Sequence, residues 1–226
     1  MNKFSYVVPT MGRYEPFWQF AEDLCHFDVV DEILIIDNDK YKTAKYREGN
    51  FSRHKKIRWL GDGNNMGVNP AWNLGIAEAR NECICIANDD IVFPFQTFYR
   101  VQDALSDEKP LIGMSAGDPI WKQPPITDGT IQVTPWITGE STHGFGCLWF
   151  IKKSWFVPIP ECLKIYYGDN FIADATFIRG KNIHLLTNFQ YCTPFAQTTK
   201  EVGGQEILMR EHRMYGEELR KWQTTL

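Results

Sequence analysis

The first half of the chain alternates short apolar runs with amphipathic segments, and this alternation is the strongest constraint on its fold. Runs of strand type are expected at 4–10, 31–39, 56–60 and 82–93. Helices are expected at 15–27, 69–80 and 95–107, with Asn69 as N-cap and Pro70 at the first helical position of the second. The polar, basic stretch 40–56 is interpreted as a loop. The order predicts an α/β domain with a mostly parallel sheet flanked by helices.

The second half has a different composition and predicts a smaller antiparallel portion. After Lys109 the sequence is rich in Trp, Pro and Gly, which is typical of loops and short antiparallel strands that cover one rim of a sheet. Phe171, Ala175 and Ile178 recur at helical spacing, and the charged tail 205–222 predicts a last helix.

The composition of the chain limits the classes of protein to which it can belong. With 226 residues, 43% of them hydrophobic, the chain can bury a sizeable core. Its net charge of -4 weighs slightly against general affinity for nucleic acid or membranes, although a local basic patch is compatible with it. No apolar run approaches 18 residues and no signal peptide is recognised, so we expect a cytoplasmic protein without a transmembrane segment. The six scattered cysteines are interpreted as reduced thiols, with Cys83 and Cys85 on one strand face.

Polar clusters follow three of the expected strands: Pro9-Thr10, Asp37 to Asp39, and Asn88 to Asp90. Ligands of such sheets bind beyond the carboxyl ends of the strands, so these clusters should converge on one rim. The adjacent carboxylates of Asp89 and Asp90 repel each other and are costly to bury unpaired. A hard divalent cation, which prefers oxygen ligands, is a suitable partner for them.

The ordered set "VVPT", "ILIIDND", "NNMGVNPAWNLGIAEA" and "ICIANDDIVFP" resembles the nucleotide-sugar glycosyltransferases of the GT-A fold, most closely the family 2 type. The resemblance implies a single GT-A domain over residues 1–226. Residues 1–109 would be the half that binds the nucleotide sugar. Residues 110–226 would be the acceptor-binding half with a C-terminal helix.

The resemblance also implies roles in donor binding. Pro9 and Thr10 would line the nucleotide site, Asp37 would meet the nucleobase, and Asp89 would lie near the ribose or the donor sugar. Arg13 is a candidate for neutralising phosphate charge. The family segment N-x-G-x-x-x-x-x-N-x-G corresponds here to Asn65, Gly67, Asn73 and Gly75.

For the metal and the chemistry, the resemblance implies Mn2+ or Mg2+ held by Asp90. Apart from the resemblance, His184 and His212 are each a candidate further ligand, with a structural role as the alternative. Asp169 is the expected general base of an inverting transfer, and Asp174 is the runner-up. Relatives commonly show Glu-Asp where this chain has Gly168-Asp169, and a helix-capping role for Asp169 is the alternative.

The sequence therefore predicts a metal-dependent glycosyltransferase with a UDP-sugar as the default donor. The acceptor is left open between a surface glycan, a protein and a hydroxylated base in phage-type DNA, and the oligomeric state is also open. Trp121 or Trp136 is expected to line the acceptor cleft, and His143 is a further candidate there. A DNA acceptor would need a cationic face, for which the candidates are Lys55, Lys56, Arg58, Lys122, Lys152 and Lys153.

Two other functions remain alternatives. The run "DNDKYKT" is similar to the Asp-x-Asp-x-Thr/Val motif of haloacid-dehalogenase-type phosphatases, although Tyr41 stands at the Thr/Val position. The second alternative is a non-catalytic carbohydrate-binding relative.

Overall fold

The computed structural model describes residues 2–114, 131–138, 144–188, 190–193 and 204–225. The described strands form one eight-stranded sheet in the order β3-β2-β1-β4-β7-β5-β8-β6. The strands are β1 (Phe4–Thr10), β2 (Val30–Asp37), β3 (Ile57–Leu60), β4 (Cys83–Ala87), β5 (Leu111–Met114), β6 (Gln132–Pro135), β7 (Leu148–Lys152) and β8 (His184–Thr187). Strands β3, β2, β1 and β4 are parallel, whereas β7 runs antiparallel to β4 and β5. Strand β8 is parallel to β5, and β6 is antiparallel to β8. The expected mostly parallel sheet with a smaller antiparallel part is confirmed.

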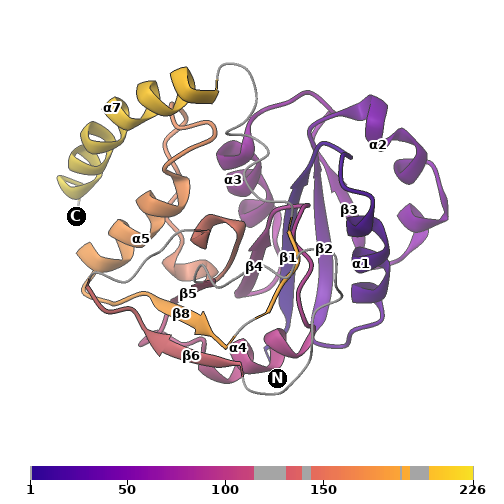
Figure 1. Cartoon of the computed structure of the whole chain (residues 1–226), viewed down its shortest axis with the longest axis horizontal. Helices are drawn as coiled ribbons and strands as arrows, with labels where there is room; N and C mark the ends of the chain where they lie inside the picture. The colour runs from indigo at the N-terminus through magenta and orange to yellow at the C-terminus, as the bar shows by residue number, and fades with distance from the viewer. Residues whose placement is uncertain (1, 115–130, 139–143, 189, 194–203, 226) are drawn as a thin grey trace.

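Helices cover both faces of this sheet (Figure 1). The described helices are α1 (Pro16–Cys25), α2 (Lys40–Arg47), α3 (Val68–Glu78), α4 (Gln96–Ala104), α5 (Gly168–Ile178) and α7 (Gly204–Gln223). Apolar residues of α1 and α4 pack with one set of alternate strand residues, which includes Tyr6, Cys83 and Cys85. Residues of α3 and α5 pack with the opposite set, which includes Val7 and Ile86. The central strands are apolar on both faces because both are buried, and Cys83 and Cys85 share a face as expected.

The prediction of a loop over 40–56 is wrong, because this stretch contains α2 and the 3-10 helix η1 (Asn50–Arg53). The side chain of Asp39 caps α2 by accepting from the amides of Tyr41 and Lys42, each at 3.3 Å. The one buried residue of α2 is Thr43, which is polar. The helix therefore has no buried apolar face, and its sequence shows almost no apolar periodicity. A capped, solvated helix of this kind is missed when hydrophobic spacing is the main signal.

The start of α3 also differs from the sequence expectation. The helix begins at Val68 with Gly67 before it, so Asn69 is not the N-cap and Pro70 is not the first helical residue. Asn69 is instead fully buried and its side chain binds a distant segment. The expected helices around Phe171 and over 205–222 are confirmed as α5 and α7, which lie alongside each other (Figure 1).

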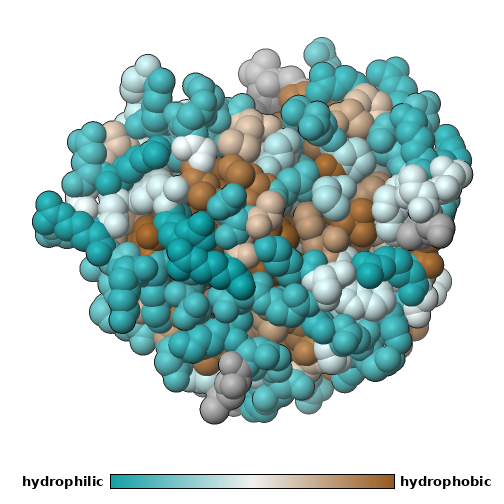
Figure 2. All heavy atoms as spheres, turned by 180° about the vertical axis from the view of Figure 1, so that it is seen from behind, coloured by the Kyte–Doolittle hydropathy of each residue, from teal (hydrophilic) through white to brown (hydrophobic). Residues whose placement is uncertain are grey.

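The face of the molecule opposite to the view of Figure 1 is mainly hydrophilic. Figure 2 shows the reverse of the view in Figure 1, with polar residues over most of that face and smaller apolar areas between them. Among the described residues, no helix combines the length and apolar character needed to cross a membrane.

Candidate active site

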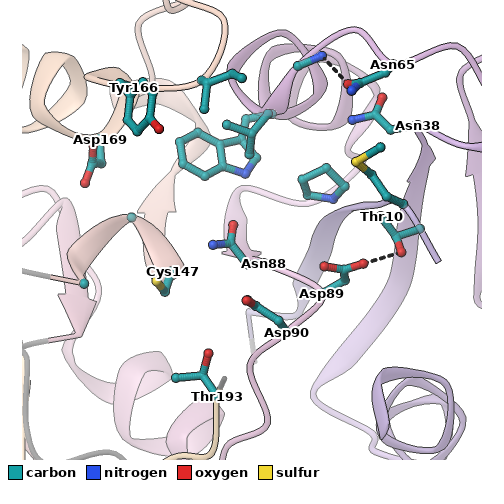
Figure 3. A pocket seen from close by; sticks show the side chains of 18 of the residues that line it. Thr10, Asn38, Asn65, Asn88, Asp89, Asp90, Cys147, Tyr166, Asp169 and Thr193 are labelled. Carbon is teal, nitrogen blue, oxygen red and sulfur yellow. Dashed lines mark hydrogen bonds between the residues drawn. The ribbon is translucent and has the colours of Figure 1, made fainter. Parts of the chain in front are cut away.

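A cavity of about 590 Å³ lies beyond the carboxyl ends of β1 and β4. One part of its wall comes from the ends of these strands and from the start of α3. The remainder comes from the segment around the 3-10 helix η2 (Phe145–Cys147), from the residues before and within α5, from Thr193 and from Leu208 of α7. The wall includes Pro9, Thr10, Arg13, Asn38, Asn65, Gly67, Trp72, Asn88, Asp89, Asp90, Gly146, Tyr166, Tyr167 and Asp169. The polar residues after β1 and β4 therefore meet at one rim, as expected for a sheet of this type (Figure 3).

Asp89 is fixed by the end of β1. The Thr10 hydroxyl donates to Asp89 Oδ2 at 2.5 Å and accepts from the Gly12 amide at 2.9 Å (Figure 3). Burial raises the pKa of the Asp89 carboxyl, and the hydrogen bonds from Thr10 and from the Met11 amide act in the opposite direction. One oxygen of Asp89 is therefore committed to the protein, and Thr10 sets the orientation of this carboxylate.

Asp90 has the less satisfied carboxylate of the pair. Its Oδ1 atom is buried and has no hydrogen-bond partner among the described residues. Burial, and secondly the charge of Asp89, raise the pKa of Asp90 to about 6. An orphaned carboxylate oxygen beside a second carboxylate fits a hard divalent cation, whose remaining ligands are commonly waters and phosphate oxygens. Water or phosphate ligands would be needed, because the described residues contain no cluster of three or more His, Cys, Asp or Glu suited to a metal.

Asp169 lies on the opposite side of the cavity from Asp89 and Asp90 (Figure 3). It stands in the first turn of α5, and Tyr167 is the residue that precedes the helix, so Asp169 is not the N-cap. Burial raises the pKa of its carboxyl, while backbone amides including that of Gly146 act in the opposite direction. Gly146 allows this approach, since a Cβ added there would lie 2.8 Å from Asp169 Oδ2. The cavity thus has a carboxylate pair on one side and a single carboxylate on the other.

Residues 5–156, which are more than half of the chain, match the family model for "Glycosyl transferase family 2". The chain belongs to glycosyl transferase family 2. The resemblance inferred from the ordered motifs is therefore confirmed, and the haloacid-dehalogenase interpretation of "DNDKYKT" is set aside. No curated protein sequence matches the chain significantly.

Solved structures similar to this family 2 chain include several of TarS from S. aureus. TarS 1-349 has a TM-score of 0.60 and 14% identity, over 84% of this chain and 60% of that one. Its complex with UDP has a TM-score of 0.60 and 15% identity, over 84% of this chain and 59% of that one. Its complex with UDP-GlcNAc has a TM-score of 0.60 and 12% identity, over 86% and 60%. This chain spans about 60% of TarS 1-349, and at these identities the likeness establishes the shared fold.

Asp37, the residue expected to meet the nucleobase, does not line the cavity. Its side chain is fully buried, and Arg47 binds its Oδ2 at 3.0 Å. Its Oδ1 accepts from the Thr43 hydroxyl at 2.9 Å and from the Asp39 amide at 3.0 Å. The carboxylate therefore joins the end of β2 to α2, and its neighbour Asn38 takes the place in the cavity wall.

We predict that Asp37→Ala lowers the free energy of unfolding by roughly 2 kcal/mol, because it removes an acceptor of the buried Thr43 hydroxyl, of the part-buried Asp39 amide and of the partly exposed Arg47 guanidinium. Asp39→Ala is the matched control and should cost about 1 kcal/mol, the value of a helix cap. Urea denaturation measures both. A variant at position 37 with the stability of the wild type and no nucleotide binding would instead support the role in nucleobase recognition.

The residues of the N-x-G-x-x-x-x-x-N-x-G segment lie in two different environments. Asn65 and Gly67 line the cavity, and Asn65 Oδ1 accepts from the Gly67 amide at 3.0 Å. Asn73 does not line it, and its side chain donates to the Ile159 carbonyl at 2.8 Å and accepts from the Ile159 amide at 2.9 Å. The second Asn of the motif thus binds the segment around Ile159, and it is not among the residues of the cavity wall.

The expected metal ligand His212 is not beside Asp90 in the cavity wall. It is exposed on α7, and its Nδ1 lies 2.9 Å from the Tyr167 hydroxyl. Asp174, the runner-up for the base, also lies outside the cavity wall and accepts a hydrogen bond from the Tyr215 hydroxyl. Trp136 packs on Phe177 at a centroid distance of 5.5 Å and does not line the cavity. The candidates Trp121 and His143 fall outside the described residues.

Of the polar cluster 37–39 that was expected at this rim, Asn38 lies in the cavity wall, whereas sequence reasoning missed Trp72 and Tyr166. The indole nitrogen of Trp72 and the hydroxyl of Tyr166 are buried without a partner among the described residues. A signal existed for Tyr166, since it lies three residues before Asp169. Trp72 could not be recognised, because in the sequence it fits the pattern of an ordinary buried apolar residue of α3.

Proposed function

We propose that this family 2 chain is a metal-dependent glycosyltransferase. It would transfer a sugar from a nucleotide diphosphate sugar, with a UDP-sugar as the expected donor, to a hydroxyl group of an acceptor. The observation that carries the proposal is the placement of the orphaned Asp90 carboxylate and of Asp169 on opposite sides of one cavity. The UDP and UDP-GlcNAc complexes of TarS support the choice of donor. We expect the reaction to take place in the cytoplasm.

Asp90 would hold the cation, Mn2+ or Mg2+, and Asp89 would face the ribose or the donor sugar. Such a cation, when bound, offsets the charge of the diphosphate leaving group. Thr10 keeps Asp89 oriented through the 2.5 Å hydrogen bond, so the donor side is organised before the donor arrives. Pro9, Asn38 and Asn65 line the part of the wall that would meet the nucleoside.

Asp169 would act as the general base. An inverting transfer needs a carboxylate that takes the proton of the acceptor hydroxyl while its oxygen attacks the sugar carbon from the face opposite the diphosphate. Asp169 meets the positional requirement, because it lies across the cavity from the carboxylate pair. Its raised pKa makes it a stronger base than an exposed aspartate.

Among the acceptors, we favour a glycan hydroxyl. Ile165, Tyr166 and Tyr167 line the acceptor side of the cavity near Asp169, and sugar rings stack well on aromatic faces. Four of the cations suggested for a DNA-binding face are already bound to the protein, and Lys122 falls outside the described residues. Lys56 donates to the Phe27 carbonyl at 2.7 Å. Arg58 pairs with Glu32 at 2.6 Å, Lys152 pairs with Asp107 at 2.6 Å, and Lys153 donates to the carbonyls of Ala77 and Ala79.

Thermal-shift screening of nucleotide sugars with and without Mn2+ tests the proposal. A preferred donor should raise Tm in the presence of Mn2+, because a ligand that binds the native state stabilises it by mass action. The same mixtures, incubated with candidate oligosaccharides, should release UDP. A chain that binds no nucleotide sugar and releases no nucleotide would contradict the proposal. Salt-sensitive binding to duplex DNA without oligosaccharide turnover would overturn the choice of a glycan acceptor.

We predict that His212→Ala needs the same Mn2+ concentration for half-maximal transfer as the wild type, within about twofold. Its imidazole contacts Tyr167, which makes it unsuited to share a cation with Asp90. The measurement is a Mn2+ titration of initial rates at saturating donor. A rise of tenfold or more in the required Mn2+ would restore the metal-ligand role that the sequence suggested.

A further inference from the structure

The residues that precede α5 form an irregular segment, 159–167, which we call the entry segment. It brings Ile165, Tyr166 and Tyr167 into the cavity wall and ends two residues before Asp169. An irregular segment of this length has few hydrogen bonds of its own, so its conformation depends on the elements around it. Two helices, α3 and α7, supply those contacts.

On one side, α3 binds the carbonyls of the entry segment. Asn69 Nδ2 donates to the carbonyls of Leu163 at 3.1 Å and Tyr166 at 3.0 Å. The Asn69 amide donates to the Lys164 carbonyl at 3.1 Å. The contact is close, since a Cβ added at Gly168 would lie 2.1 Å from Asn69 Oδ1. The start of α3 is therefore hydrogen-bonded to the segment that leads to Asp169, the proposed base.

On the other side, α7 binds the amides of the same segment through Glu211. This side chain is fully buried, and its carboxylate accepts from the amides of Lys164 at 2.9 Å, Ile165 at 3.1 Å and Tyr166 at 2.8 Å. A buried carboxylate is costly unless it is hydrogen-bonded, and three amide donors satisfy it. Because carbonyls face α3 and amides face α7, the stretch from Lys164 to Tyr166 is held from two directions.

The last residue of the entry segment has a strained backbone. Tyr167 has φ 62°, in the left-handed region that non-glycine residues rarely adopt. Its ring stacks on Tyr215 of α7 with centroids 5.2 Å apart, and its hydroxyl lies 2.9 Å from His212 Nδ1. Strain of this kind persists only when the surrounding structure fixes it, and here α7 supplies those contacts next to the cavity.

We infer that Glu211 and His212 are positioning residues, through which α7 holds the entry segment and thereby fixes Tyr166, Tyr167 and Asp169 for the acceptor. The inference about catalysis rests on the proposed function, whereas the clamp on the segment does not. A displacement of about 1 Å in a catalytic group can reduce the rate by about 100-fold, so a distant carboxylate can affect turnover without touching substrate.

The clamp is tested by hydrogen–deuterium exchange on the full chain. Glu211→Gln puts an NH2 group, itself a donor, against the three backbone donors, so peptides covering 163–169 should exchange at least tenfold faster while β1 and β4 keep their protection. Glu217→Gln, the same change at an exposed position of α7, is the matched control and should exchange like the wild type. Equal protection of 163–169 in both variants would overturn the clamp, whatever the chain catalyses.

The effect on catalysis is tested on the same variants. Glu211→Gln should lower kcat at least tenfold or raise the KM for the acceptor at least fivefold, while the Kd for UDP with Mn2+ stays within twofold. That split would not arise if the residue contributed only to global stability, because the folded fraction would then scale donor binding and turnover together. Faster exchange with unchanged kcat and acceptor KM would overturn the positioning role. A wild-type chain that transfers no sugar would contradict the proposed function, and the exchange rates of 163–169 would still decide whether the clamp exists.

Discussion

Asp90→Asn should lower the rate of sugar transfer by at least about 100-fold and abolish the dependence of nucleotide binding on Mn2+. Asparagine keeps the shape of the side chain but removes the charge that would hold the cation. The side chain is in the cavity wall and its Oδ1 has no partner among the described residues, so the substitution costs the folded protein no hydrogen bond at that atom. Calorimetric titration with UDP, with and without Mn2+, measures the loss of binding.

The fold should survive this substitution. The pKa of Asp90 is raised to about 6, which means that its ionised form is disfavoured in the folded state, so a neutral side chain should leave Tm equal or higher above that pH. Asp103→Asn, the same change at an exposed position of α4, is the matched control and should behave as the wild type. Survival of both transfer and Mn2+-dependent binding in Asp90→Asn would remove Asp90 from the site.

The part of the site that we propose binds the donor is largely predictable, because its residues follow buried strands whose apolar runs are easily recognised. Once β1 and β4 are placed side by side, Thr10 and Asp89 must approach each other, and the structure joins them at 2.5 Å. Asp37 follows a strand equally clearly, yet its side chain turns to Arg47. Sequence reasoning could not anticipate this, because the partner lies in α2, a solvated helix without apolar periodicity.

The proposed acceptor side is less predictable, because its geometry depends on contacts between distant parts of the chain. Asn69 and Leu163 are 94 residues apart, and Glu211 is 47 residues from Lys164. Local spacing cannot reveal such pairs. It suggests a helix cap for Asn69, and the residue type alone suggests a metal ligand for His212. In both cases the residue type indicates a polar partner, and in the structure that partner belongs to the entry segment.

Asp169→Asn should reduce the rate of transfer by about 10²–10⁴-fold with little change in donor binding, because it removes the proposed general base and leaves the carboxylate pair intact. Asp174→Asn, on the same helix, is the matched control. Asp174 lies outside the cavity wall, and an Asn oxygen there still accepts from Tyr215, so this variant should retain most activity. Initial rates at saturating donor and acceptor measure both. A large loss of rate in Asp174→Asn with little loss in Asp169→Asn would indicate that Asp174 is the base.

The pH dependence gives a second readout for the same variant. A general base acts when ionised, and burial raises the pKa of Asp169, so kcat of the wild type should fall as pH drops through a value above the ordinary aspartate range. The sign for stability is the reverse, because a raised folded-state pKa means that ionisation weakens folding as pH rises through it. Asp169→Asn should therefore keep its reduced rate yet be at least as stable as the wild type at about pH 7.5. A variant that loses activity and Tm together would indicate that Asp169 serves the fold and not the proton transfer.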